Sequence, residues 1–157
     1  MNPSGAGLRQ PDARTCGAAC MIVAAGASPA SFTTDVLAAH RRLTRLRLRG
    51  RLQLPWPRAL GTPPWAVARE LAAVTGTPHR TRVVRWSRSA PPRAGALYVG
   101  SRWLPRHVVL VVDAGAGTAE APPRCYEPAS GRVVPLDGRP LAGWRHRWLA
   151  VTPVASR

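Results

Sequence analysis

Residues 10–27, QPDARTCGAACMIVAAGA, set the layout of this chain because they place a cysteine at the start of an unusually apolar segment. From Cys16 onward the residues are small and apolar on every side, which predicts a helix that is buried on most of its surface. Gly26 and Pro29 mark its end. In the first turn of such a helix, Cys16 would meet the positive end of the helix dipole, which favours a thiolate. The stretch therefore fits both a reactive cysteine and an inert, packed one.

Two more helices and a strand-rich half follow this segment. Residues 31–34 offer N-cap side chains for an amphipathic helix at 35–45, and prolines in the first turn and a final glycine delimit a helix at 63–76. Beyond it, short β-branched or aromatic runs are separated by Pro, Gly and Ser. We expect strands at 80–85, 96–100, 107–113, 124–127, 132–136 and 148–151. This order predicts an α+β fold, one domain over residues 1–157, with N-terminal helices packed on a C-terminal antiparallel sheet.

The positive charge of the chain invites a nucleic-acid interpretation. The 157 residues carry a formal net charge of +16, with 23 basic residues against 7 acidic ones. Every one of these basic residues is arginine, and the scarcity of Lys, Asn, Ile and Phe points to a GC-rich genome rather than to selection for a polyanion. The densest basic run, residues 40–51, contains none of the aromatic residues that stack on bases. We therefore expect no nucleic-acid partner, and an arginine-rich nucleic-acid binder is the weakest alternative.

Neither a membrane segment nor a metal site is expected. The first ten residues contain no apolar run of signal-peptide length, and no stretch approaches the roughly 18 apolar residues that span a bilayer. The three cysteines, Cys16, Cys20 and Cys125, form no zinc-ligand pairs, and their odd number favours free thiols in a reducing compartment. We expect a cytoplasmic protein without cofactor or metal, in which Cys20 and Cys125 are buried packing residues. The oligomeric state is left open.

A thiol that transfers acyl groups needs a base, a group that orients the base, and donors for the oxyanion. His107 begins the segment HVVLVV, a strand that would hold its imidazole over the sheet, facing the helix that starts at Cys16. Glu127, which ends RCYE, would lie on a neighbouring strand and hold the ring in one tautomer. Asp137 could take that place only if the chain turned back. If these groups act together, the Cys16 sulfur and a His107 nitrogen should lie within roughly 4 Å.

Four stretches follow one another in a specific order. The first is RQPDARTCGAACM, residues 9–21, with a glutamine six residues before the cysteine, and the helix at 63–76 comes next. Then follow GALYVGSRWLPRHVVLVVDA, residues 95–114, and CYEPASGRVVPLD, residues 125–137. In this order they resemble the C39 peptidases and C39-like cysteine peptidases, which have a papain-like fold. The order of Gln, Cys, His and acid, residues 10–127, covers about three-quarters of the chain.

The resemblance assigns a role to each of these residues. It implies that Cys16 is the nucleophile and that His107 is the general base and acid. Gln10 would add its side-chain amide to the oxyanion hole beside the Cys16 N–H, and Glu127 would orient His107. The family usually has aspartate where this chain has Glu127, whose side chain is one methylene longer. The substrate would be a peptide or protein, for example a leader peptide, and Trp103 is a candidate for the wall of its cleft.

Two alternatives use the same fold. A catalytically silent papain-like domain would bind a peptide or a partner protein without cleaving it. A transferase or deamidase would form the same thioester, because the nucleophile and the oxyanion hole do not fix the group that resolves it.

Overall fold

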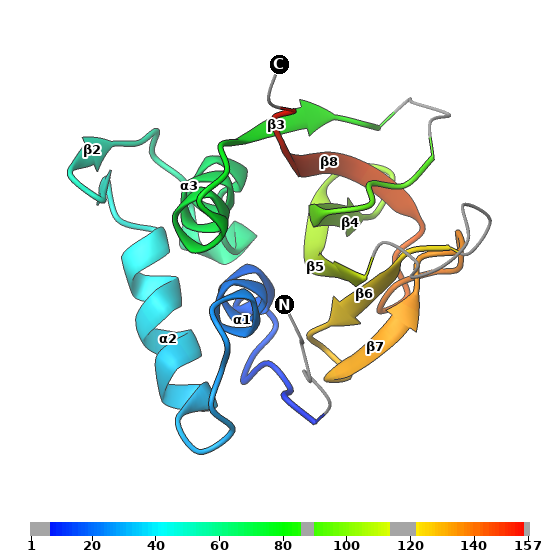
Figure 1. Cartoon of the computed structure of the whole chain (residues 1–157), viewed down its shortest axis with the longest axis horizontal. Helices are drawn as coiled ribbons and strands as arrows, with labels where there is room; N and C mark the ends of the chain where they lie inside the picture. Colours follow the sequence, from blue (N-terminus) through cyan, green and yellow to red (C-terminus); the bar gives the residue numbers. More distant parts are fainter. Residues whose placement is uncertain (1–6, 86–89, 114–121, 156–157) are drawn as a thin grey trace.

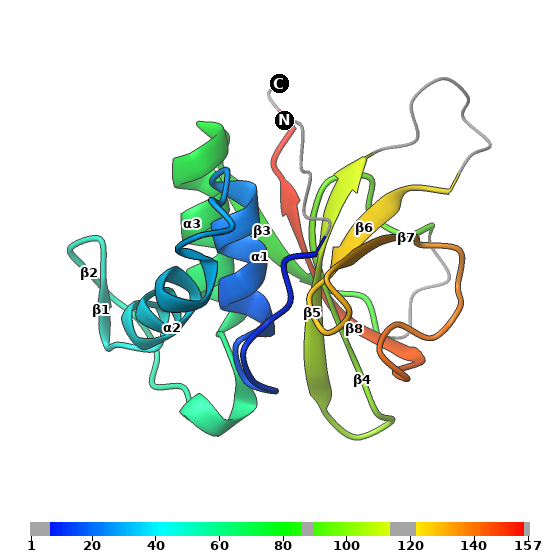
Figure 2. The ribbon, with the colours of Figure 1, turned by 90° about the horizontal axis from the view of Figure 1, so that it is seen from below.

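Residues 7–85, 90–113 and 122–155 are described in the computed structural model of the chain. Within these ranges a layer of helices packs against one face of an antiparallel sheet (Figures 1 and 2), which confirms the expected α+β class. The helices are α1 (Cys16–Ala24), α2 (Phe32–Leu43) and α3 (Pro64–Thr75). A ribbon of β1 (Arg47–Leu48) and β2 (Arg51–Leu52), then a 3₁₀-helix, η1 (Arg58–Leu60), connect α2 to α3.

Helix α1 is the centre of the helical layer and lies between α2, α3 and the sheet (Figure 1). Eight of its nine residues are buried, as its small apolar composition predicts. Small side chains let neighbouring elements come close, and the Cys20 thiol donates a hydrogen bond to the carbonyl of Val108 at 3.5 Å. The helix ends at Ala24, two residues before Gly26, which was expected to mark its end.

The sheet of the described residues has the strand order β3–β8–β4–β5–β6–β7, and each neighbouring pair is antiparallel. The strands are β3 (His79–Val83), β4 (Gly95–Gly100), β5 (Pro105–Asp113), β6 (Arg124–Glu127), β7 (Arg132–Pro135) and β8 (His146–Pro153). Each predicted strand is present. The last one, expected at 148–151, is longer and inserts between β3 and β4, so the end of the chain closes the middle of the sheet.

Apolar side chains pack on both faces of this sheet. The larger cluster joins α1, α2 and α3 to one face, and a smaller cluster around Leu97, Val109 and Cys125 covers the other. Leu136, Leu141 and the following loop close over that second face. The sheet is therefore buried at its centre on both sides, which explains the nearly continuous apolar run of β5.

The second helix, α2, has other bounds than the sequence predicts. Helix α2 begins at Phe32 rather than at Asp35, because Ser31 precedes it and Asp35 lies in its first turn, where a carboxylate oxygen accepts a hydrogen bond from Ser31 Oγ at 2.6 Å. The basic run 40–51 ends this helix and then forms the β1–β2 ribbon, which the sequence did not predict.

The lengths of the helices test the expectation that the chain has no membrane segment. No helix among the described residues is long and apolar enough to cross a membrane. Residues 1–6, the start of the stretch in which no signal peptide is expected, lie outside the described residues.

Candidate active site

Cys16 is the first residue of α1 and is held there by the turn that precedes the helix. The Thr15 hydroxyl donates a hydrogen bond to the carbonyl of Asp12 at 3.1 Å, and the Asp12 carboxylate accepts one from the backbone N–H of Arg14 at 2.8 Å. The Thr15 side chain makes no capping bond to the helix. The first-turn N–H groups thus keep their donor capacity beside the Cys16 sulfur.

Gly17 allows a second segment to lie directly against this first turn. A Cβ atom at this position would lie 2.7 Å from the Thr62 Cβ, which is a steric overlap. Thr62 is buried, and its carbonyl accepts a hydrogen bond from the Tyr98 hydroxyl of β4 at 2.9 Å. The absence of a side chain on Gly17 therefore lets the segment before α3 connect the start of α1 to the sheet.

His107 of β5 and Glu127 of β6 form a buried pair. The distance from His107 Nε2 to Glu127 Oε1 is 2.6 Å, and both side chains are less than one-tenth exposed. The same carboxylate accepts hydrogen bonds from the backbone N–H groups of Ala129, at 2.8 Å, and Ser130, at 2.9 Å. The longer glutamate therefore reaches the ring while its carboxylate folds back over the turn that follows β6.

The Cys16 side chain lies near the His107 imidazole, close enough to raise the pKa of the ring. Because Nε2 is paired with Glu127, Nδ1 is the ring nitrogen that remains for a second partner. His107 thus has a carboxylate on one ring nitrogen and a thiol in its neighbourhood.

The contacts of this pair shift both of its pKa values. Burial alone would lower the pKa of His107, but hydrogen bonds with Cys16 and Glu127 raise it to about 9. Burial alone would raise the pKa of Glu127, but hydrogen bonds from His107, Ser130 and Ala129 lower it to about 2. Near neutral pH the pair is an imidazolium and a carboxylate.

Gln10 is placed beside this pair by the segment that precedes α1. Its backbone N–H donates to the carbonyl of Pro128 at 2.8 Å, and the Tyr126 hydroxyl of β6 donates to the carbonyl of Leu8. Gly131 permits this close approach, since its φ is +66° and a Cβ there would lie 3.0 Å from the Leu8 carbonyl. The Gln10 Oε1 atom is buried and has no hydrogen-bond partner among the described residues.

A cleft of about 700 Å³ opens over Gln10 and His107. The turn before α1, the 3₁₀-helix η1 and the start of β5 form its walls, and its cationic side chains are Arg14 and Arg106. Cys16 is 3% exposed and is not among the residues that line this cleft. The four predicted residues Gln10, Cys16, His107 and Glu127 are thus brought together, although they come from four separate parts of the sequence.

Two sequence expectations about neighbouring residues differ from the structure. Trp103 does not line the cleft: it is 70% exposed and stacks against Arg102. Trp144 lines the cleft instead. It is 37 residues beyond His107 in the chain, and only the return of β8 into the sheet brings it there, so no local motif marked it. Asp137 contacts Arg139, not His107.

The other two cysteines lack the surroundings of Cys16. Cys20 is completely buried and its pKa is raised well above its usual value, first by burial and then by the charges of neighbouring groups. Burial also raises the pKa of Cys125 to about 12. All three are free, buried thiols, and Cys20 and Cys125 belong to the apolar clusters, as expected of packing residues. Among the described residues no group of three His, Cys, Asp or Glu is arranged to hold a metal ion.

Comparisons with known proteins give no match to a family model, to a curated protein or to a solved structure. The function must therefore be inferred from the chemistry of the site.

Proposed function

We propose that this chain is a cysteine peptidase with a papain-like fold, similar to the C39 peptidases. The observation that carries the proposal is the position of His107, which pairs with the Glu127 carboxylate at 2.6 Å and has the Cys16 side chain near enough to raise the pKa of its ring. A buried thiol, imidazole and carboxylate in this order form the arrangement that activates a cysteine nucleophile. A helix that begins with the nucleophile and packs on the strand that carries the histidine also supports the papain-like assignment.

In the first half of the reaction, the Cys16 thiolate attacks the carbonyl carbon of the peptide. The C=O π electrons move to oxygen, and that oxyanion is met by the backbone N–H of Cys16 and by the Gln10 side-chain amide. The imidazolium of His107 then gives its proton to the leaving amine as the C–N bond breaks. The product is a thioester on Cys16 and a free amine.

In the second half, His107 acts as a base. It takes a proton from water as the water oxygen attacks the thioester carbon, and the C–S bond breaks to release the acid. The proton on His107 restores the imidazolium beside the thiolate. Glu127 holds the ring in one orientation throughout, because two backbone N–H groups fix its own carboxylate. A transferase or deamidase would differ only in the group that attacks the thioester.

The direct test is labelling by a thiol-reactive peptide, such as a peptidyl vinyl sulfone, combined with an assay of peptide hydrolysis. Cys16→Ala should abolish both while the folded state persists, because no other described thiol contacts an imidazole. Cys20→Ala is the matched control, one helical turn away, and should keep both. Equal labelling of the wild type and the Cys16→Ala variant would contradict the proposal. A folded wild type that neither reacts nor hydrolyses peptides would be a silent binding domain.

A further inference from the structure

The β1–β2 ribbon and the residues beside it expose leucines that the core does not use. Figures 1 and 2 show the ribbon at the end of the helical layer farthest from the sheet. Leu46, Leu52 and Leu54 are 58%, 67% and 69% exposed. Leu52 and Leu54 line one groove of about 390 Å³ together with Trp65 of α3, so they belong to a continuous apolar surface. A group of large apolar side chains in contact with water marks an interaction site.

Arginines stand beside these leucines without a matching acid. Residues 44–63 contain no Asp or Glu, and the nearby Glu70 of α3 already pairs with two arginines. Three further arginines are exposed and have no ion pair within the described part of the chain: Arg45, Arg47 and Arg51. Arg47 is the cross-strand neighbour of Leu52, so charge and apolar surface lie side by side. We call residues 45–47, 51, 52 and 54 the ribbon surface.

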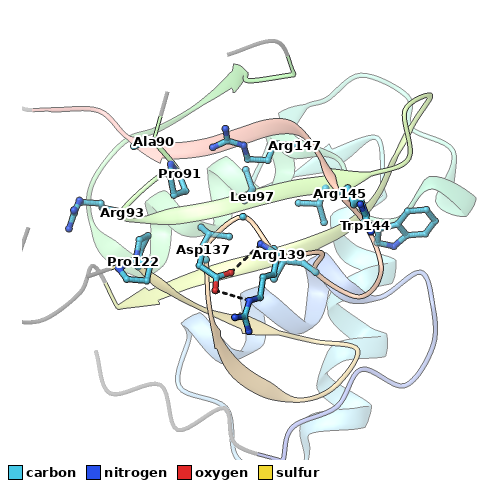
Figure 3. A pocket seen from close by; sticks show the side chains of 15 residues that line it. Ala90, Pro91, Arg93, Leu97, Pro122, Asp137, Arg139, Trp144, Arg145 and Arg147 are labelled. Atoms are coloured by element: carbon cyan, nitrogen blue, oxygen red, sulfur yellow. Dashed lines mark hydrogen bonds and ion pairs between the residues drawn. The ribbon is translucent and has the colours of Figure 1, made fainter. Parts of the chain in front are cut away.

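A second group of arginines differs from the ribbon surface. It lines a cavity of about 540 Å³ on the face of the sheet that is turned away from the helices (Figure 3). Arg139 pairs there with Asp137, with 3.3 Å between Nε and Oδ2, and Figure 3 draws this contact. Arg93 and Arg147 also have interaction partners. The leucines of this cavity are buried, so exposed leucine beside unpaired charge distinguishes the ribbon surface from it.

We propose that the ribbon surface docks the protein on a membrane that contains anionic lipids. Anionic headgroups attract the arginines, and the leucines beside them enter the boundary between headgroups and acyl chains. A GC-rich genome explains the number of arginines, but it does not explain why leucines are left in water next to them. The ribbon surface shares no residue with the cleft over His107, so docking is separate from the proposed peptidase chemistry.

A bilayer fits the ribbon surface better than other anionic partners do. A nucleic acid would pair with the arginines and leave the leucines in water. A second copy of the chain would bring like charges together. A stable protein interface takes about 800 Å² of complementary surface from each partner, whereas a bilayer accepts a few protruding side chains.

Sedimentation of the full chain with vesicles tests the role of the leucines. Vesicles of phosphatidylcholine with an equal part of phosphatidylglycerol should bind at least about tenfold more tightly than phosphatidylcholine alone, and less tightly as salt is added. Leu52→Gln with Leu54→Gln should lose about tenfold in affinity at unchanged charge. Val83→Gln with Val154→Gln removes exposed apolar side chains elsewhere and should lose less than about twofold. Equal losses in these two double variants, or equal binding to the two kinds of vesicle, would overturn the proposal.

The arginines are tested with a second pair of variants. Arg45→Gln with Arg51→Gln should lose about tenfold in affinity for the mixed vesicles. Arg82→Gln with Arg132→Gln changes the net charge equally on β3 and β7 and should lose less than about twofold. Equal losses would assign binding to the net charge of the chain and overturn the proposal.

Two further results would also overturn membrane docking. One is a wild type that binds neither kind of vesicle. The other is displacement from the mixed vesicles by a soluble peptide of alternating Glu and Leu, at a concentration below that of the anionic lipid, which would assign the ribbon surface to an acidic protein partner. Hydrolysis of a soluble peptide should be unchanged in all four double variants. The vesicle result therefore stands or falls independently of the peptidase assignment.

Discussion

Glu70 in the helical layer and Glu127 in the sheet are the buried glutamates of the described chain, and both are held by cationic groups. Glu70 of α3 pairs with Arg42 at 3.1 Å and with Arg49 at 2.9 Å, which ties α3 to α2 and to the loop of the β1–β2 ribbon. These arginines are almost half exposed and permanently charged. Glu127 pairs with a buried imidazole, which loses its proton as the pH rises through about 9.

The difference suggests a way to separate a structural carboxylate from one that serves the proposed chemistry. The partners of Glu70 cannot transfer a proton, and its pairing joins elements of the fold. The partner of Glu127 has a thiol nearby and faces a cleft. Burial and ion pairing are common to both sites, so neither property alone distinguishes them. The titratable partner does, and it is the reason that we propose the Glu127 site as the catalytic one.

Removal of that partner should have the largest effect. His107→Ala takes away both the base and the cation beside Cys16, so we expect kcat/KM for an activated acyl ester to fall by about 10⁴-fold. Glu70→Ala should leave the activity per folded molecule within about twofold, since its cluster does not touch the cleft. Ester hydrolysis, with the folded fraction measured by circular dichroism, compares the two. A similar loss in both variants would mean that stability, not chemistry, limits activity.

Neutralising each glutamate gives the next largest contrast. Glu127→Gln keeps the size of the side chain but removes the charge that holds the His107 imidazolium, and we expect a loss of about 10² to 10³-fold in kcat. Glu70→Gln should change kcat by less than about twofold. Single-turnover acylation of each variant measures this difference. Unchanged acylation in Glu127→Gln would show that the carboxylate does not orient the base.

The pH dependence of kcat/KM should also change in Glu127→Gln and not in Glu70→Gln. The pKa of His107 is raised to about 9, so its proton is held through neutral pH and is lost only as the pH rises through about 9. The kcat/KM of the wild type should therefore fall on an alkaline limb near pH 9, because the leaving amine then lacks a proton donor. In Glu127→Gln this limb should move toward the ordinary pKa of histidine, and in Glu70→Gln it should stay in place. An identical limb in all three proteins would assign it to another group.

The smallest contrast is in stability. The stabilising effect of the His107–Glu127 pair is fully present between about pH 4.5 and 6.5, since the folded pKa of Glu127 is lowered to about 2 and that of His107 raised to about 9. Glu70→Gln should lower the free energy of unfolding by about 1.5 kcal/mol at any pH in this range, because it removes the charge that binds two arginines. The loss stays modest because Arg42 and Arg49 are almost half exposed and are hydrated when they lose this partner. Glu127→Gln should cost a similar amount at pH 6 and less at pH 9. Urea unfolding at both pH values tests this, and a pH-independent cost for Glu127→Gln would contradict it.

The sequence predicted the parts of this molecule that depend on local pattern. The all-round apolar composition after Cys16 indicated α1, and β-branched runs between Pro and Gly located the strands. The grouping of Cys16, His107 and Glu127 could be predicted from the sequence. Cys16 begins a helix, and the other two residues lie on two strands that were expected to be neighbours. The sequence alone could not show whether the side chain of Glu127, one methylene longer than aspartate, can reach His107. In the structure it does so, with its carboxylate folded back onto the N–H groups of Ala129 and Ser130.

The parts that the sequence did not predict depend on contacts between distant segments. The place of β8 between β3 and β4 is decided by packing and not by its own composition. Trp144, in the turn before β8, reaches the cleft as a consequence of that return. Trp103 was favoured because it is close to His107 in sequence, but it lies in the exposed turn between β4 and β5. Closeness to His107 along the chain therefore did not predict which tryptophan lines the cleft.

The central claim is that Cys16 carries the acyl group, and trapping that group tests it most directly. A reaction with an activated acyl ester is quenched in acid within the first turnovers and digested with trypsin, and the peptide that follows Arg14 is fragmented to separate Cys16 from Cys20. The account predicts one acyl group, on Cys16, in the wild type, and its near absence in His107→Ala. An acyl group on Cys20 or Cys125, or ester turnover with no acyl group on any cysteine, would contradict it.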